Sequence, residues 1–198
     1  MFEPEFFNRL LAKKAILFDF DDTLAIPERD EEGEYIVDEH GFIKASHLDE
    51  QRFRKAVQIS IQKNIPLFIV TGRPDIPQNR DLFSNFIKSV DGFHPGLGGF
   101  KENSFYFISQ MILENGVLVR KEVTTKDAVV QTVHQTEFKH LKASDILFVE
   151  DLDRYLDPVA ALGYETILVD PDDLDHGHLD KAITFMVAEV KQLEVEFN

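Results

Sequence analysis

The sequence contains no cysteine and no tryptophan. Without cysteine the chain forms no disulfide, offers no thiol nucleophile and builds no zinc–thiolate site. It also has no uninterrupted run of about 18 apolar residues, the length that a membrane-spanning helix needs. The first ten residues include Glu3, Glu5 and Arg9 and have no continuous apolar segment, unlike a secretory signal. These absences predict a cytoplasmic protein that does not enter a membrane.

Basic residues are few as well. The chain has 21 Lys and Arg against 36 Asp and Glu, a formal net charge of −15, and such a charge repels nucleic acids and anionic membrane surfaces. A length of 198 residues suits one domain of ordinary size, so we expect a single domain over residues 1–198. The 18 phenylalanines can fill a core or form an apolar surface that pairs two copies, and composition leaves both open.

The spacing of apolar residues predicts alternating strands and helices. Buried strands are expected at residues 15–20, 66–70, 145–149 and 165–169, and helices at 47–64, 75–90, 126–141 and 157–162. Residues 105–123 are expected to be strand, interrupted by a turn at Asn115-Gly116. This alternation predicts a three-layer α/β/α, Rossmann-like fold in which helices cover both faces of a central parallel sheet.

Two segments add to this core. Apolar residues near helical spacing predict a short N-terminal helix over residues 1–14. Residues 25–46, after the first strand, are expected to form a small flap, a hairpin with a glycine turn. Neither this flap nor the segment 92–123 has the length of a cap domain, so we expect none.

The most informative stretch is Ala15-Ile16-Leu17-Phe18-Asp19-Phe20-Asp21-Asp22-Thr23-Leu24. Its apolar strand leads to Asp19 and Asp21, and alternate residues of an extended strand point the same way. Two carboxylates held close together repel each other and lose solvation, so they need a metal ion, a shared proton or a basic group. If these acids only capped the following turn, one such side chain would suffice instead of three.

Polar side chains also follow two other predicted strands. Thr71-Gly72-Arg73-Pro74 follows the strand at 66–70, and Glu150-Asp151 follows the strand at 145–149. Ligands of open parallel sheets bind beyond the carboxyl ends of the strands. Three strand ends therefore predict one site.

These motifs resemble the signature of the haloacid dehalogenase-like (HAD) hydrolase superfamily. That signature is an apolar strand with Asp-x-Asp-x-Thr, a strand ending in Ser or Thr, a lysine that opens a helix and a strand ending in paired acids. The match covers most of residues 15–170, in the family's order. In this family an Asp at the position of Asp21 implies phosphate chemistry. The resemblance thus implies a Mg²⁺-dependent phosphomonoester hydrolase that acts through an aspartyl-phosphate.

The resemblance also implies roles for single residues. Asp19 would be the nucleophile, and Asp21 would be the general acid and then the general base. Mg²⁺ would be held by the carboxylates of Asp19 and Asp151 and by the backbone carbonyl of Asp21. Glu150 would contact the ion directly or through another ligand.

The remaining motif residues would contact the phosphate. The Thr71 hydroxyl and the Gly72 amide would hydrogen-bond it. Two uses of Arg73 stay open: it binds a second anionic group of the substrate, or it pairs with an acid of the flap. Two lysines compete to neutralise the phosphate, and we expect Lys126, which opens a helix, because Lys121 lies within a predicted strand.

Two other features are assigned no site. The run Gly96-Leu97-Gly98-Gly99 lacks the strand before it and the helix after it that a dinucleotide-binding loop requires, and is expected to be a flexible connection. His176 and His178 lie among acidic residues and resemble a metal cluster, but we expect a solvated acidic loop.

The short flap predicts an open site, which suits a phosphorylated protein side chain or a small phosphorylated molecule. The acid-rich flap favours a substrate of low negative charge. A catalytically silent module that keeps the fold and binds metal or phosphate is the alternative. It would be favoured by a missing nucleophile or general acid, and the sequence has both.

Overall fold

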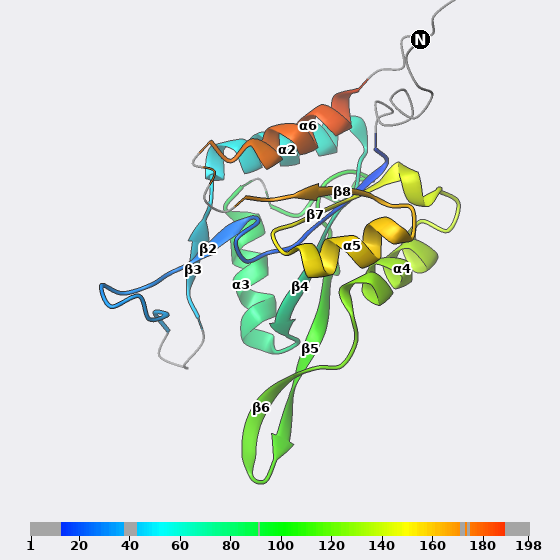
Figure 1. Cartoon of the computed structure of the whole chain (residues 1–198). Coiled ribbons are helices and arrows are strands. Elements are labelled where there is room, and N and C mark those ends of the chain that lie inside the picture. The colour runs from blue at the N-terminus through cyan, green and yellow to red at the C-terminus, as the bar shows by residue number, and fades with distance from the viewer. Residues whose placement is uncertain (1–12, 38–42, 91, 171–172, 174, 189–198) are drawn as a thin grey trace, which may run out of the picture.

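The structure is a computed structural model that describes residues 13–37, 43–90, 92–170, 173 and 175–188. Its main sheet has six strands. In spatial order they are β6 (Val117–Glu122), β5 (Phe105–Glu114), β4 (Leu67–Pro74), β1 (Ala15–Phe18), β7 (Ile146–Glu150) and β8 (Glu165–Leu168). All neighbouring strands are parallel except β5 and β6. The predicted parallel sheet is confirmed, with one antiparallel edge strand (Figure 1).

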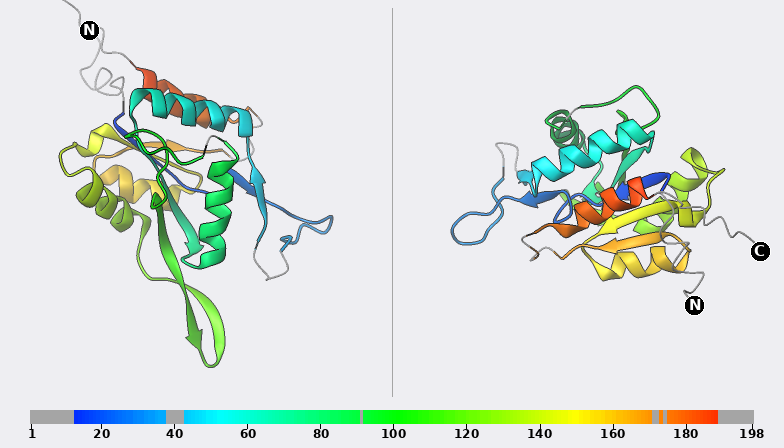
Figure 2. Two further views of the ribbon diagram at one scale, coloured as in Figure 1. Left: turned by 180° about the vertical axis from the view of Figure 1, so that it is seen from behind. Right: turned by 90° about the horizontal axis from the view of Figure 1, so that it is seen from above.

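Helices cover both faces of this sheet. One face is covered by α2 (Glu50–Lys63), α3 (Pro77–Lys88) and α6 (Gly177–Val187), and the other by α4 (Lys126–Glu137) and α5 (Asp153–Ala161) (Figures 1 and 2). A short 3-10 turn, η1 (Ala143–Asp145), leads into β7. The three-layer α/β/α architecture predicted from the alternation of apolar segments is therefore confirmed.

Strand β1 shows how the sequence produces these layers. Ile16 and Phe18 belong to the apolar cluster under α2, α3 and α6, whereas Ala15 and Leu17 belong to the cluster under α4 and α5. Alternate side chains of a strand point to opposite faces, so a strand that is apolar at every position is stable between two layers of helices. The continuous apolar run before Asp19 thus makes β1 a central strand.

The β5–β6 hairpin forms one edge of the sheet. Its two turn residues, Asn115 and Gly116, have φ angles of 53° and 82°. Positive φ at both positions is typical of the two-residue turns that match the twist of a hairpin. The turn predicted at Asn115-Gly116 is confirmed, and the hairpin extends past the end of β4 (Figure 1).

The flap follows β1. Strands β2 (Ala25–Pro27) and β3 (Ala45–His47) pair antiparallel in a small second sheet, and Val37 and Ile43 form an isolated bridge farther out. This pairing is that of a hairpin, as predicted for residues 25–46. The flap is too short to be a domain of its own.

Parts of two predictions lie outside the described residues. They are the glycine turn of the flap, which falls within residues 38–42, and the N-terminal helix up to residue 12. Among the described residues no cap domain is present, and no helix has the length and apolar character needed to cross a membrane.

Helix α6 was not predicted. We expected a solvated acidic loop around His176 and His178, but His178 is in this helix, is 3% exposed and donates from Nε2 to the Thr23 carbonyl oxygen at 2.9 Å. The helix buries its apolar face against the sheet through Leu179, Ala182, Ile183 and Met186. Their spacing is helical, and the acids and histidines that precede them obscured this signal.

Residues 96–99, expected to be a flexible connection, contact α2. Gly98 approaches α2 so closely that a Cβ atom there would lie 2.2 Å from the Ser60 carbonyl oxygen. The Gly99 amide donates to the Ile65 carbonyl oxygen at 3.0 Å. This segment is packed on the helix, and a side chain at residue 98 would displace the backbone.

Candidate active site

The ends of three central strands meet at one place. Phe18 at the end of β1 pairs with Ile69 of β4 on one side and Val149 of β7 on the other. The next residue, Asp19, donates its amide to the Val149 carbonyl oxygen at 2.8 Å. The carboxylates that follow β1 and β7 are therefore adjacent, as the positions of the motifs in the sequence predicted.

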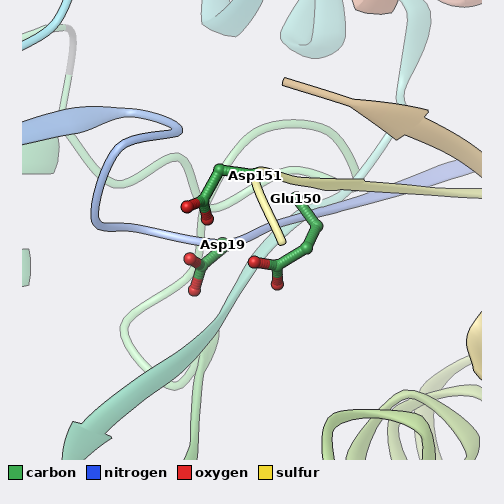
Figure 3. A group of neighbouring side chains, drawn as sticks. All are labelled: Asp19, Glu150 and Asp151. Carbon is green, nitrogen blue, oxygen red and sulfur yellow. The ribbon is translucent and has the colours of Figure 1, made fainter. Parts of the chain in front are cut away.

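Three carboxylates converge there. Asp19, Glu150 and Asp151 each offer an oxygen within 4.8 Å of the other two (Figure 3). Asp19 and Glu150 are 5% and 0% exposed. Burial raises the pKa of Asp19 to about 6, against the pull of the nearby Lys126 charge. Burial also raises the pKa of Glu150, and the charge of Asp19 raises it further.

Lys126 compensates part of this charge. It is the first residue of α4 and 2% exposed, with its Nζ atom 2.8 Å from Asp19 Oδ1 and in contact with the Glu150 carboxylate. Burial by itself lowers the pKa of Lys126, but the two carboxylates outweigh burial and raise it. Lys121 is exposed and pairs with Glu114 at 3.4 Å. Of the two lysines weighed from the sequence, only Lys126 contacts the acids.

Glu150 is engaged by protein donors at both oxygens. One contacts Lys126, and the other accepts a hydrogen bond from the Leu152 amide at 3.2 Å. The side chain therefore anchors Lys126 and the turn that presents Asp151. Of the two alternatives for Glu150, this geometry favours an indirect role in metal binding.

Arg73 does not pair with an acid of the flap, one of its two expected uses. Its Nε and Nη2 atoms donate to the Asp21 carboxylate at 2.9 and 2.6 Å, and Nη1 donates to the Ile43 carbonyl oxygen at 3.0 Å. The partner is the Asp of the first motif, and the flap contributes a backbone carbonyl in place of an acid. These bonds use three of the five N–H donors of the guanidinium group, so binding of a second substrate anion by Arg73 stays a prediction.

The predicted phosphate-binding pair lies beside this contact. Thr71 is fully buried, and its Oγ1 atom accepts a hydrogen bond from the Arg73 amide at 3.1 Å. Gly72 lines the cavity above the acids and Thr71 does not. A phosphate in this cavity would contact Gly72 and not the buried Thr71 side chain.

The cavity has a volume of about 580 Å³. Its floor is formed by the motif residues, including Asp19, Asp21, Lys126 and Asp151. Its walls come from the flap, from the β5–β6 hairpin and from the start of α5, through Tyr35, Met111, Arg120, Arg154 and Tyr155. These wall residues were not predicted, because nothing in their sequence positions indicates that they lie together.

The donor set fits a divalent cation. Lys126 supplies one positive charge against Asp19, Glu150 and Asp151. Asp19 Oδ1 is buried without an aligned hydrogen bond from any described residue, although Lys126 Nζ lies 2.8 Å away. Burial and then the charges of Asp151 and Asp21 raise the pKa of Asp22, a further sign of excess negative charge. Clustered carboxylate oxygens are the ligands that Mg²⁺ prefers.

Comparison with known proteins identifies the fold. No family model matches the sequence, and no curated protein matches it. A Vibrio cholerae protein assigned as a 3-deoxy-D-manno-octulosonate 8-phosphate phosphatase superposes with a TM-score of 0.56 at 14% identity, over 93% of this chain and 88% of that one. A Legionella pneumophila protein assigned to HAD superfamily hydrolases of subfamily III A superposes with a TM-score of 0.53 at 12% identity, over 92% of this chain and 88% of that one. The chain has the HAD hydrolase fold.

A further solved structure agrees. The 3-deoxy-D-manno-octulosonate 8-phosphate phosphatase of Yersinia pestis superposes with a TM-score of 0.51 at 12% identity, over 92% of this chain and 87% of that one. At such identities the likeness is one of fold. The resemblance inferred from the motifs is confirmed at that level, and the chemistry of this HAD-fold chain must be argued from its own residues.

The acid cluster predicts metal-dependent stability. Mg²⁺ at ten times its dissociation constant is expected to raise the midpoint of thermal unfolding by about 3–6 °C, since a ligand stabilises the state that binds it. D151N should remove this rise and D153N, an exposed acid two residues away, should keep it. Differential scanning calorimetry measures both. An equal rise in the two variants would place the ion elsewhere.

Proposed function

We propose that this protein is a Mg²⁺-dependent phosphomonoester hydrolase that acts through an aspartyl-phosphate on Asp19. The observation that carries the proposal is the buried contact of Asp19 with Lys126 on the floor of a cavity that Asp21 and Asp151 also line. A carboxylate in that position is a competent phosphoryl acceptor, and covalent transfer divides one difficult step into two. The intact Asp19 and Asp21 speak against a catalytically silent module.

In the first step the Asp19 carboxylate attacks phosphorus as the bond from phosphorus to the ester oxygen breaks. Asp21 gives its proton to the departing oxygen, which leaves as an alcohol. In the second step Asp21 takes a proton from water, the water oxygen attacks phosphorus, and the bond to Asp19 breaks. Inorganic phosphate leaves and both carboxyl groups return to their starting states.

Charge compensation falls to the groups around Asp19. Lys126 is positioned to balance the charge of Asp19 and of the incoming phosphate, and the Gly72 amide to donate to a phosphate oxygen. Thr71 would orient the same turn. Bound Mg²⁺ would be held by Asp19, Asp151 and the Asp21 backbone carbonyl, and would offset the negative charge of the phosphate.

Arg73 is a positioning residue in this scheme. Its two hydrogen bonds to the carboxylate hold the Asp21 side chain in one orientation, and its third joins that position to the flap at Ile43. A proton donor must lie within hydrogen-bonding distance of the departing oxygen. Without this pair the Asp21 side chain would adopt other orientations and lie within reach of that oxygen less often.

A small phosphorylated molecule is the proposed substrate. Cavities of about 300–1,000 Å³ suit small ligands, and this one measures about 580 Å³. The Yersinia pestis neighbour, named as a phosphatase of 3-deoxy-D-manno-octulosonate 8-phosphate, acts on such a molecule. A screen of phosphorylated metabolites and phosphopeptides separates this substrate class from a phosphoprotein.

The purified protein is expected to hydrolyse p-nitrophenyl phosphate when Mg²⁺ is present. D19N should lower kcat by about 10³-fold or more, because the nucleophile is lost, and EDTA should abolish the rate. D153N is the control and should retain activity. Release of p-nitrophenol, followed by absorbance, measures all of these. The mechanism is excluded if hydrolysis persists both in EDTA and in D19N.

The two lysines should differ sharply. K126A is expected to lower kcat/KM for p-nitrophenyl phosphate by about 10²-fold or more, since a charged group beside the reacting phosphate is lost, while K121A stays near the wild type. Because K126A leaves Glu150 buried and unpaired, K126A/E150Q restores the charge balance of the core and should fold without regaining activity. The opposite ranking of the lysines would refute the role assigned to Lys126.

The arrangement of Arg73 predicts a dependence on the leaving group. R73M should lower kcat by about 10²-fold for an alkyl phosphate, whose poor leaving group needs a proton from Asp21, and by much less for p-nitrophenyl phosphate. R80M removes an exposed arginine that pairs with Asp75 and is the control. Equal losses on the two esters would show that Arg73 does not act through Asp21.

A further inference from the structure

Two arginines of the cavity wall have no part in the proposed mechanism. Arg120 lies on β6 of the β5–β6 hairpin, and Arg154 lies in the first turn of α5. Both line the same cavity as Asp19 and Lys126, although they come from segments outside the motifs. The other cationic residues of the cavity, Arg73 and Lys126, are paired with the two carboxylates of the first motif, Asp21 and Asp19.

Arg120 is directed at the reacting end of the cavity. It pairs across the hairpin with Met111, which also lines the cavity. Its Nε atom donates to Oγ of the buried Ser109 at 3.2 Å. Its Nη2 atom would lie 3.5 Å from a Cβ atom placed on Gly72. The guanidinium group is thus anchored next to the glycine proposed to meet the phosphate.

Arg154 is joined to Arg120 through two other side chains. Its Nη2 atom donates to the Tyr155 hydroxyl at 3.3 Å, and that hydroxyl donates to Glu122 Oε1 at 3.0 Å. The same Glu122 oxygen lies 3.6 Å from Arg120 Nη2. This chain of contacts ties β6 to α5 and holds both arginines at the wall. Arg154 forms no ion pair with a carboxylate within the described part of the chain.

The charge around the cavity differs from that of the whole protein. In a chain of formal charge −15, this one cavity is lined by as many cationic as acidic side chains, four of each, and the acids Asp19, Asp21, Asp22 and Asp151 all lie at the ends of β1 and β7. The acids in the described part of the flap do not line it, and Asp30 caps the flap turn by accepting from the Glu32 and Glu34 amides. The sequence-based argument for a substrate of low negative charge relied on those acids, so it does not hold for the cavity itself.

We infer that the substrate carries a second anionic group, a carboxylate or a second phosphate, close to its phosphorylated end, and that Arg120 and Arg154 bind this group. A guanidinium group matches both anions because it donates two parallel hydrogen bonds. The reacting phosphate already has Lys126 and the Gly72 amide, so the outer arginines are available to another anion. This inference rests on the proposed function and specifies the substrate class of that site.

Matched pairs of esters test the inference. One pair is 3-phosphoglycerate and glycerol 3-phosphate, which differ by a carboxylate, and the other is fructose 1,6-bisphosphate and fructose 6-phosphate, which differ by a phosphate. The wild type should prefer the more charged member of at least one pair by about tenfold or more in kcat/KM, mostly through KM. The pair that shows the preference tells a carboxylate from a phosphate.

The variant R120Q/R154Q should reduce that preference to near one. The ratio within a pair is the readout, because a general loss of activity lowers both members alike. R154Q alone breaks no ion pair with a described carboxylate, so it provides a second variant if the double variant fails to fold. K121Q is the matched control, since Lys121 follows Arg120 on the same strand and its side chain points to the opposite face. It should keep the wild-type ratio.

Two results would overturn the inference. One is a wild type that shows no preference in either pair. The other is an unchanged preference in R120Q/R154Q. An equal loss of activity on all esters is included in this result, because it is expected if the arginines contact the reacting phosphate. Failure of the proposed function looks different, since p-nitrophenyl phosphate would then not be hydrolysed. Calorimetry would then compare the binding of 3-phosphoglycerate and of glycerol 3-phosphate. Tighter binding of 3-phosphoglycerate that is lost in R120Q/R154Q would support the inference. Equal binding of the two esters would overturn it.

Discussion

The ammonium group of Lys126 makes the contacts on which this site depends. It lies 2.8 Å from Asp19 and also touches Glu150, and all three side chains are almost completely buried. Removing one partner of a buried ion pair costs about 3–5 kcal/mol because a charge stays in the core uncompensated. The contacts also require Phe18 beside Val149 and a helix that begins at Lys126. The candidate active site therefore depends on the sheet register and on the residue at which α4 begins.

Around this centre the side chains divide into two groups by what they touch. The inner group, Asp19, Asp21 and Lys126 with Arg73 as support, is held by ion pairs on the floor of the cavity. The outer group stands on the hairpin and on α5, where tyrosine and glutamate link the arginines of two separate elements. A wall built on separate elements can vary without disturbing the floor, as is common where one fold serves many substrates.

Most of the strands and helices could be predicted because their signals are local. A fully apolar run defines β1, and Asn115-Gly116 has the turn chemistry of a hairpin. The choice of Lys126 over Lys121 also followed from placement at a helix start. Helix α6 was missed because acids and histidines at its start suggested a loop. The segment is a helix because His178 and its apolar neighbours are buried there.

The sequence by itself determined which residues the proposed chemistry uses, since the spacing of Asp19 and Asp21 after an apolar strand and the order of the motifs can be seen directly along the chain. Only the tertiary structure decided how the charges pair. Arg73 pairs with Asp21, and Arg120 and Arg154 line one cavity, because the sheet order and the helix packing bring together segments that are far apart in the chain. The strength of such pairs depends on burial and distance, which no local pattern encodes.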